Sequence, residues 1–300
     1  MYMDRTKSSY IYAGLAILFW STVPTVFKIS LAELDILTML TIAVITSTLV
    51  LLIIVVFSGK WHLIRENNGR DLLNSAILGL VNPFLYYLIL LNAYKLLPAQ
   101  VAQPLNMIWP IILVFLSVPL LGQKIERKSF IALFISFAGV YLISSQGKPF
   151  HPGGSDLTGV LMAAGSSIFW AFYFILNVKD KRDEAVKLLL NFLFGSCYLL
   201  TAMILTGNSQ PMIGFRGVAG SVYIGIFEMG LTFFFWLKAL SLATTTDKVS
   251  NLVYFAPFIS LLFVHFFLNE PVYYTTPAGL LLIIAGILIQ NRKTVRIKNI

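Results

Sequence analysis

The sequence predicts an all-α integral membrane protein whose ten transmembrane helices form two inverted five-helix repeats. Three observations lead to this fold class. Of the 300 residues, 58% are hydrophobic and only 12% are charged, whereas soluble domains carry roughly 25% charged residues. Apolar stretches long enough to cross a bilayer recur along the whole chain, and the second half repeats markers of the first. We therefore expect membrane lipid to surround most of these side chains.

The spanning segments are expected to be helices of about 20 mainly apolar residues, the length that crosses a bilayer. Strands of a membrane barrel would instead alternate polar and apolar residues. Charged or glycine- and proline-rich separators lie between the apolar stretches, for example Ser58-Gly59-Lys60 and the run from Gly207 to Pro211. In chain order, the predicted helices are residues 10–29, 36–57, 72–92, 99–121, 129–145, 157–178, 187–206, 217–238, 248–268 and 273–290.

The Lys and Arg residues predict the orientation of these helices, because cytoplasmic loops are enriched in basic residues. If the N-terminus is cytoplasmic, the ten-helix topology places 18 of the 22 basic residues on the cytoplasmic side. The other four, Lys28, Lys95, Lys148 and Arg216, fall outside. We therefore expect both termini in the cytoplasm and the chain in a plasma membrane, such as a bacterial inner membrane. The net charge of +9 comes from these short loops, so no nucleic-acid partner is expected.

Matched markers divide the chain into two repeats, residues 1–146 and 147–300. Because each repeat has five helices, an odd number, the second repeat enters the membrane in the opposite orientation. Inverted repeats around a midplane site are a recurring plan of secondary transporters. The markers that coincide after shifts of 146 to 150 residues are Gly79 with Gly225, Pro110 with Pro257, Ala138-Gly139 with Ala285-Gly286, and Phe19-Trp20 with Phe169-Trp170.

Phe19-Trp20-Ser21 lies in the first predicted helix, Pro110 precedes Leu121-Gly122-Gln123 in the fourth, and Pro257 precedes Leu268-Asn269-Glu270-Pro271 in the ninth. This pattern resembles the EamA-type branch of the drug/metabolite transporter superfamily. The resemblance implies an exporter-like carrier of amino acids and other metabolites, with a central cavity lined by helices 1, 3, 4, 6, 8 and 9. The family often has Gly-Glu where this chain has Gly122-Gln123, so the acidic residue is present only in the second half, at Glu270.

Glu228 is the sharpest candidate for a functional residue, because it lies at the middle of the predicted helix 217–238. A charged acidic residue at this depth costs about 2.5–3.5 kcal/mol on insertion scales. We hypothesise that Glu228 binds a proton or the ammonium group of a substrate; the alternative is a hydrogen bond between helices. A shift of 146 residues places Asn82 on Glu228. The two side chains are therefore expected to face each other across a midplane cavity, with Pro83 freeing a backbone carbonyl nearby.

Further cavity residues are expected on two helices that carry polar side chains at helical spacing. Gln103, Asn106 and Trp109 are three residues apart and share one face, and Asn251 and Tyr254 are also three apart. The alternative is ordinary hydrogen bonding between helices. Aromatic surface is expected from Trp20, Tyr86, Trp170, Tyr173 and Trp236, although interfacial belts and plain packing are the usual roles of such residues.

Enzyme chemistry is not expected from this sequence. It contains no phosphate-binding loop and no metal-ligand cluster, so no catalytic residue, cofactor or metal is predicted. The favoured function is a secondary membrane transporter, an exporter of small organic metabolites such as amino acids, which works by alternating access around a midplane cavity. Two alternatives stay open: a passive channel or facilitator, and a membrane enzyme or scaffold of a complex. Coupling to protons rests on Glu228, and the oligomeric state is left open.

Overall fold

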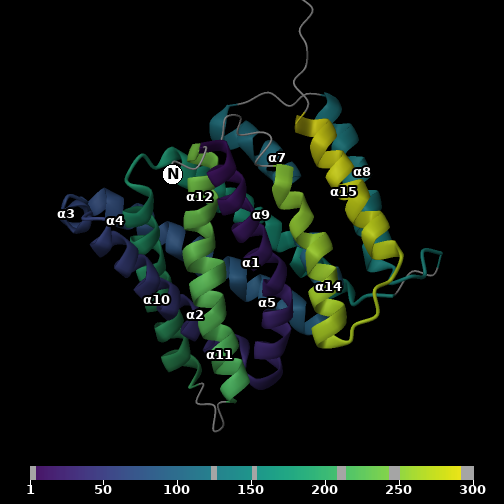
Figure 1. Ribbon diagram of the computed structural model, residues 1–300, viewed down its shortest axis with the longest axis horizontal. Helices are drawn as coiled ribbons and strands as arrows, with labels where there is room; N and C mark the ends of the chain where they lie inside the picture. Colours follow the sequence, from purple (N-terminus) through teal and green to yellow (C-terminus); the bar gives the residue numbers. More distant parts are fainter. Residues whose placement is uncertain (1–4, 123–126, 151–153, 208–213, 243–250, 292–300) are drawn as a thin grey trace, which may run out of the picture.

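A computed structural model of the chain describes residues 5–122, 127–150, 154–207, 214–242 and 251–291. Every regular element in these ranges is a helix, which confirms the predicted all-α class (Figure 1). Seven helices of the described residues are long and apolar enough to cross a membrane, by length and composition. Two shorter apolar helices, Leu252–Leu268 and Thr275–Ile289, follow them in the chain.

The first half contains five of the predicted spanning segments, each of which is helical. In chain order its elements are α1 (Arg5–Glu33), α2 (Ile36–Phe57), the short α3 (Trp61–Arg65), α4 (Gly69–Gly79), η1 (Leu80–Leu85), α5 (Tyr86–Leu96), α6 (Ala99–Asn106), α7 (Trp109–Leu121) and α8 (Arg127–Ser144). The third span is kinked: α4 and α5 are joined by the π-helical segment η1, inside which the backbone of Asn82 is not helical. The fourth is broken between α6 and α7, beside Pro104 and Pro110, because proline cannot donate a backbone hydrogen bond.

The second half follows the same order of elements. They are α9 (Leu157–Lys179), α10 (Glu184–Thr206), α11 (Phe215–Tyr223), η2 (Ile224–Leu231), α12 (Thr232–Leu242), η3 (Asn251–Phe255), α14 (Ala256–Leu268) and α15 (Thr275–Asn291). Here too a π-helical segment, η2, interrupts the third span of the half, and a shift of 146 residues places η1 on its last six residues. The helices α7 and α14 are both 13 residues long and start 147 positions apart. Each ends in a left-handed residue, Gly122 and Asn269.

Contacts between the halves are reciprocal. A Cβ on Gly79 of α4 would collide with the carbonyl oxygen of Asn191 in α10, and a Cβ on Gly225 of η2 would collide with the carbonyl oxygen of Ala43 in α2. Ala43 and Asn191 are 148 positions apart, so the two contacts join equivalent places in the two halves. The division of the chain into two inverted repeats stays a prediction.

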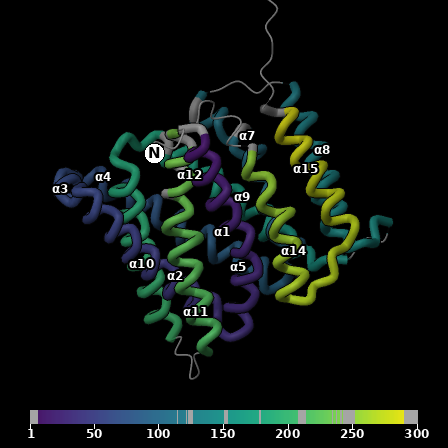
Figure 2. The backbone as a smooth tube through the Cα atoms, in the orientation of Figure 1, coloured from purple at the N-terminus to yellow at the C-terminus, as the bar shows by residue number. Residues whose placement is uncertain are grey.

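Two further helices, α8 and α15, lie side by side at one edge of the bundle (Figure 2). Their backbones approach closely at Gly139 and Gly279: a Cβ on either glycine would lie 2.5 Å from the carbonyl oxygen of the other. Small residues permit such close approach between membrane helices, where van der Waals packing drives association.

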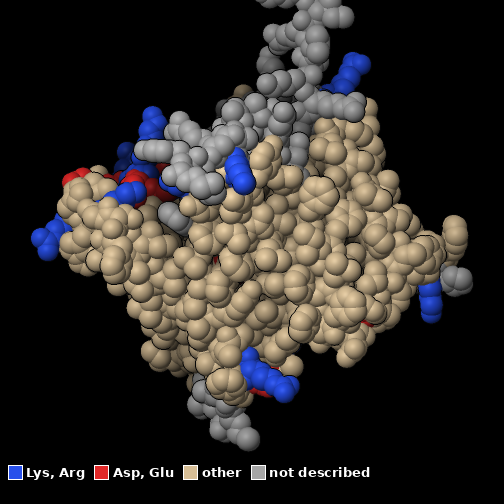
Figure 3. Space-filling view, in the orientation of Figure 1, with Lys and Arg blue, Asp and Glu red and all other residues tan. Residues whose placement is uncertain are grey.

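The surface has the charge distribution expected of a protein surrounded by lipid. In Figure 3 the blue and red atoms gather near the ends of the bundle, and the belt between them is almost entirely uncharged. Large apolar side chains of this surface are highly exposed, including Phe57, Phe134 and Leu205 at 88%, 72% and 81%. Apolar area of this extent would be unfavourable in water. The start of α1 and the end of α15 lie at the same end of the bundle (Figure 1).

Candidate functional site

A cavity of about 130 Å³ lies among α1, α5, α6, α7, α9, η2, η3 and α14, so both halves contribute to it. This volume is smaller than the roughly 300–1,000 Å³ of pockets for drug-sized ligands. Its lining residues are Trp20, Val23, Pro24, Phe27, Tyr86, Leu90, Tyr94, Gln103, Asn106, Met107, Trp109, Trp170, Glu228, Val253 and Ala256. The contributing segments correspond to predicted helices 1, 3, 4, 6, 8 and 9, the set that the family resemblance implies.

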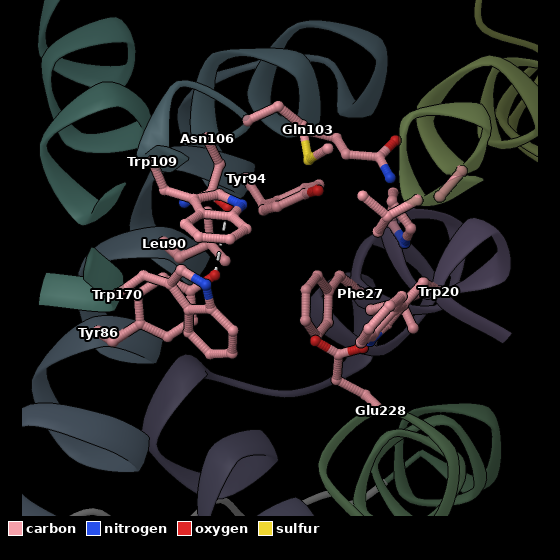
Figure 4. A pocket seen from close by; sticks show the side chains of 15 residues that line it. Trp20, Phe27, Tyr86, Leu90, Tyr94, Gln103, Asn106, Trp109, Trp170 and Glu228 are labelled. Carbon is pink, nitrogen blue, oxygen red and sulfur yellow. Dashed lines mark hydrogen bonds between the residues drawn. The ribbon is translucent and has the colours of Figure 1, made fainter. Parts of the chain in front are cut away.

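Several residues singled out from the sequence meet in this cavity. The predicted residues that line it are Trp20, Tyr86, Gln103, Asn106, Trp109, Trp170 and Glu228. In Figure 4, Tyr86, Trp109 and Trp170 lie on one side of the central space, and Trp20, Phe27 and Glu228 lie on the other. Both sides of the cavity therefore carry aromatic rings, and the carboxyl group of Glu228 lies on one side only.

Glu228 projects from η2 with its carboxyl group directed toward the central space (Figure 4). The hydroxyl group of Tyr87 donates a hydrogen bond to Oε1 of Glu228 at 3.1 Å. The other oxygen, Oε2, is buried and has no hydrogen-bond partner among the described residues. A buried acceptor without a donor is costly, so this oxygen is suited to a proton or a cationic group. A π-helical segment such as η2 is frequent at functional sites.

Asn106 organises the opposite wall. Its Oδ1 accepts a hydrogen bond from the hydroxyl group of Tyr86 at 3.2 Å, and its Nδ2 donates to Oγ of Ser166 at 2.7 Å. Ser167 Oγ donates to the backbone carbonyl of Asn106 at 2.8 Å, where α6 ends. The two bonds with Ser166 and Ser167 hold the end of α6, where the fourth span is broken, against α9. Asn106 thus both lines the cavity and joins helices, which combines the two roles considered for it.

The aromatic rings of the cavity are supported by one another. The ring centroid of Trp170 lies 5.1 Å from that of Tyr86 and 6.5 Å from that of Trp109. On the other side, Trp20 packs against Trp236 with centroids 5.4 Å apart. Trp236 was predicted to line the cavity, but in the structure it supports Trp20 instead. Aromatic pairs at these distances prefer tilted or edge-to-face geometry, which fixes the exposed ring faces.

The expectation that Asn82 faces Glu228 across the cavity is wrong. Asn82 is 1% exposed and is not among the lining residues. Its backbone is extended (φ −149°, ψ 121°), as is favoured before a proline, and this interrupts the helical course at Pro83. Its Oδ1 is buried without a hydrogen-bond partner among the described residues. The hydroxyl group of Tyr173 accepts a hydrogen bond from Nδ2 of Asn191 at 3.5 Å. Tyr173 is itself buried there, 4% exposed, and does not line the cavity either.

The remaining predicted residues belong to the segment that enters α14. Tyr254 is half-buried and packs against the main hydrophobic core, outside the cavity lining. The side chain of Asn251 lies outside the described part of the chain. The neighbouring Val253 and Ala256 reach the cavity instead.

Sequence reasoning missed several lining residues that helical spacing could have found. Phe27 lies seven residues after Trp20, and Leu90 and Tyr94 lie four and eight after Tyr86, so each set follows one helix face. Tyr87 was noted in the sequence only for its aromatic surface and was not among the predicted cavity residues. It contacts Glu228 without lining the cavity, and no spacing rule connects residues from distant helices.

The chain was compared with known proteins. The profile of the EamA-like transporter family matches residues 7–145 and 157–292. The chain belongs to this family. It is therefore a multi-pass membrane transporter and not an enzyme, and the family indicates a small-molecule substrate. The resemblance inferred from the sequence is confirmed.

Individual relatives agree with this assignment. "Uncharacterized transporter YvbV" of Bacillus subtilis strain 168 is 27% identical over 250 residues, which cover 81% of this chain and 79% of the relative. "Protein PecM" of Dickeya dadantii strain 3937 is 25% identical over 221 residues, 71% of each chain. A crystal structure with a TM-score of 0.66 and 19% identity covers 95% of this chain and 97% of its own, which shows a shared fold.

Proposed function

We propose that the chain is a secondary transporter that exports small organic metabolites bearing an ammonium group, amino acids among them, by alternating access around the described cavity. The observation that carries this proposal is the cavity itself. It is lined from both halves, and it contains one acidic side chain whose Oε2 has no hydrogen-bond partner among the described residues. Access would alternate as the two halves rock about this site.

The proposed architecture is ten transmembrane helices in two inverted repeats, residues 1–146 and 147–300. It is supported by the two separate family matches, residues 7–145 and 157–292. It is also supported by the equal lengths of α7 and α14 and by the reciprocal contacts of Gly79 and Gly225. An odd number of helices in each half requires the halves to have opposite orientations.

The proposed location is a plasma membrane, such as a bacterial inner membrane, with both termini in the cytoplasm. The distribution of Lys and Arg supports this orientation. Reporter fusions at the two termini test it: a periplasmic signal from either terminus would contradict the proposed topology.

Flux in proteoliposomes tests the function. Glu228→Gln is expected to lower substrate flux at least about tenfold, because a hydrogen bond to a charged group contributes about 1.5–3 kcal/mol and ~1.4 kcal/mol corresponds to tenfold. The matched control is Glu66→Gln, an exposed glutamate in the loop after α3. Equal flux in Glu228→Gln and wild type would remove this residue from the mechanism.

The same preparation distinguishes the alternatives and tests proton coupling. A carrier accelerates uptake of labelled substrate when unlabelled substrate is present inside, whereas a passive channel shows neither this exchange nor saturation. Flux that responds to an imposed pH gradient in the wild type but not in Glu228→Gln supports coupling at this carboxyl group. Flux that ignores the gradient in both indicates facilitated diffusion.

A further inference from the structure

The only charge that the described cavity lining can carry is negative. Of the 15 residues that line it, Glu228 is the one with an ionisable carboxyl group, and none is Lys, Arg or His. Lys28 directly follows the lining residue Phe27 but is not in the lining, and it interacts electrostatically with Glu270 near the end of the bundle. The described lining therefore offers a site for one positive charge and no countercharge for a negative one.

Backbone donors do not supply this missing countercharge at the helix break beside the cavity. A helix N-terminus can bind an anion through its free N–H groups. At the start of α7, however, Pro110 has no N–H, and the N–H groups of Ile111 and Ile112 both donate to the carbonyl oxygen of Ile108. Pro257 similarly occupies the second position of α14.

The other polar side chains on the lining are neutral, and some of their hydrogen-bonding groups already have partners within the protein. Asn106 uses Oδ1 and Nδ2 for Tyr86 and Ser166. Gln103 makes no hydrogen bond to a described residue and remains available, as do the indole N–H groups of the tryptophans. Such donors suit a hydroxyl, ether or carbonyl oxygen. They would not offset the repulsion between Glu228 and a second carboxylate, because like charges in a site of low polarity repel strongly.

The rest of the lining suits an organic cation. Ring faces of Trp20 and Phe27 stand beside Glu228, and those of Tyr86, Trp109 and Trp170 stand opposite (Figure 4). A cation over an aromatic face is attracted by the ring quadrupole, more so when it is desolvated. The apolar side chains of Val23, Leu90, Met107 and Val253 complete the wall and can hold an apolar body.

We propose that this site selects a small monovalent amine with an apolar or aromatic body and discriminates against zwitterionic amino acids. The ammonium group would pair with Oε2 of Glu228, and the body would lie between the two aromatic walls. This inference rests on the proposed transport function but narrows it: of the metabolites that carry an ammonium group, those without a carboxylate are preferred.

Equilibrium binding to the purified full-length protein tests the proposal with ligands that differ in one group. Phenethylamine, phenylalanine and phenylalanine methyl ester share the aromatic body and the amine; only phenylalanine carries a free carboxylate. Binding measured by calorimetry is expected to be at least about tenfold tighter for phenethylamine and the methyl ester than for phenylalanine. Equal or tighter binding of phenylalanine overturns the proposal, and so does the absence of binding by all three ligands at millimolar concentration.

Two variants locate the selectivity. Glu228→Gln is expected to abolish the preference for phenethylamine, with Glu66→Gln as the unaffected control. Gln103→Lys adds a positive charge to the lining and is expected to shift the preference toward phenylalanine. It tests the same idea if Glu228→Gln does not fold, as judged by size-exclusion chromatography. An unchanged ratio of the two affinities in a folded variant of either kind refutes the assignment.

Flux measurements separate this inference from the proposed function. If phenethylamine binds selectively but proteoliposomes show no flux or exchange of it, transport fails while the site chemistry stands. If phenylalanine is carried and exchanged as well as phenethylamine, transport stands while the selectivity fails.

Discussion

Arg182 lies in the loop between α9 and α10, and replacing it should destabilise the protein more than replacing any exposed neighbour. Its guanidinium group donates to both carboxylate oxygens of Asp180, with distances of 3.0 Å and 2.5 Å, and also to Asn67 Oδ1 and Ser75 Oγ, both at 2.9 Å. The last two acceptors belong to the first half of the chain. The arginine therefore ties the two halves together at the end of the bundle that holds α3 (Figure 1).

The magnitude follows from burial and bond count. The side chains of Arg182 and Asp180 are 15% and 5% exposed, and removing one partner of a buried pair costs about 3–5 kcal/mol. Asp180 would keep a bond from Nδ2 of Asn74 at 3.1 Å, so we expect the lower limit, about 3 kcal/mol. At roughly 2 °C per kcal/mol, as for larger soluble domains, Arg182→Ala should lower the unfolding temperature by about 6 °C.

The assay is thermal unfolding of the detergent-purified protein, with Lys181→Ala as the control. Lys181 is exposed and adjacent, so this change removes the same charge without the buried bonds. Arg182→Lys should fall between the two, because an ammonium group cannot reproduce the planar fork. A decrease for Arg182→Ala no larger than that for Lys181→Ala would refute the reasoning.

Three further outcomes are expected. Gly225→Ala should destabilise the protein by at least about 1 kcal/mol through overpacking against α2, whereas Gly14→Ala, which meets no atom within 4 Å, should be neutral or stabilising; equal unfolding temperatures would contradict the close contact. Burial raises the pKa of Asp180, but hydrogen bonds from Arg182 outweigh it and hold this pKa below its usual 3.8. The stabilisation is therefore present above about pH 4 and lost as pH falls further, so thermal unfolding of the wild type should show an acid decrease that Arg182→Ala lacks. Glu270→Ala should cost about 1 kcal/mol, as for a lost helix cap; an unchanged unfolding temperature would argue against that role.

The helices could be predicted from the sequence because the length of an apolar stretch is a direct physical requirement of a bilayer. Glu228 could be found for the same reason, since an acidic residue at that depth is costly. The position of Asn82 could not be inferred from the repeat. Asn82, which precedes Pro83, has the extended backbone that is favoured before a proline, whereas Glu228 has no proline after it and lies in η2, so equivalent positions point in different directions.

Contacts between distant segments were beyond sequence reasoning. In the sequence, Arg182 counted only as one of the basic residues that predict the orientation. In the structure it forms a buried network with Asp180, Asn67 and Ser75. Tyr87 illustrates the same limit within the site. It follows Tyr86 in the chain, but consecutive residues of a helix point about 100° apart, so Tyr86 lines the cavity while Tyr87 bonds Glu228.

Glu270 has a structural role that its equivalent in the first half, Gln123, is not needed to share. Its carboxylate accepts hydrogen bonds from the N–H groups of Ala99 and Gln100 at 3.1 Å and 3.4 Å, and so caps α6 of the other half. Glu33 of the first half in turn accepts from the N–H of Gly217 at 2.7 Å, near the start of α11 in the second. Each half thus supplies one carboxylate to a helix N-terminus of the other, at the end of the bundle opposite the start of α1.

These two carboxylates occupy different positions in their halves, Glu33 after the first span and Glu270 after the fourth. The exchange between halves therefore does not require a glutamate at position 123, where this chain has glutamine. A carboxylate near a helix N-terminus is stabilising whichever residue of the chain carries it. The free N–H groups and the helix dipole attract any nearby negative charge. If access alternates by rocking of the halves, both caps lie where the halves must separate, so their strength should influence how readily that end opens.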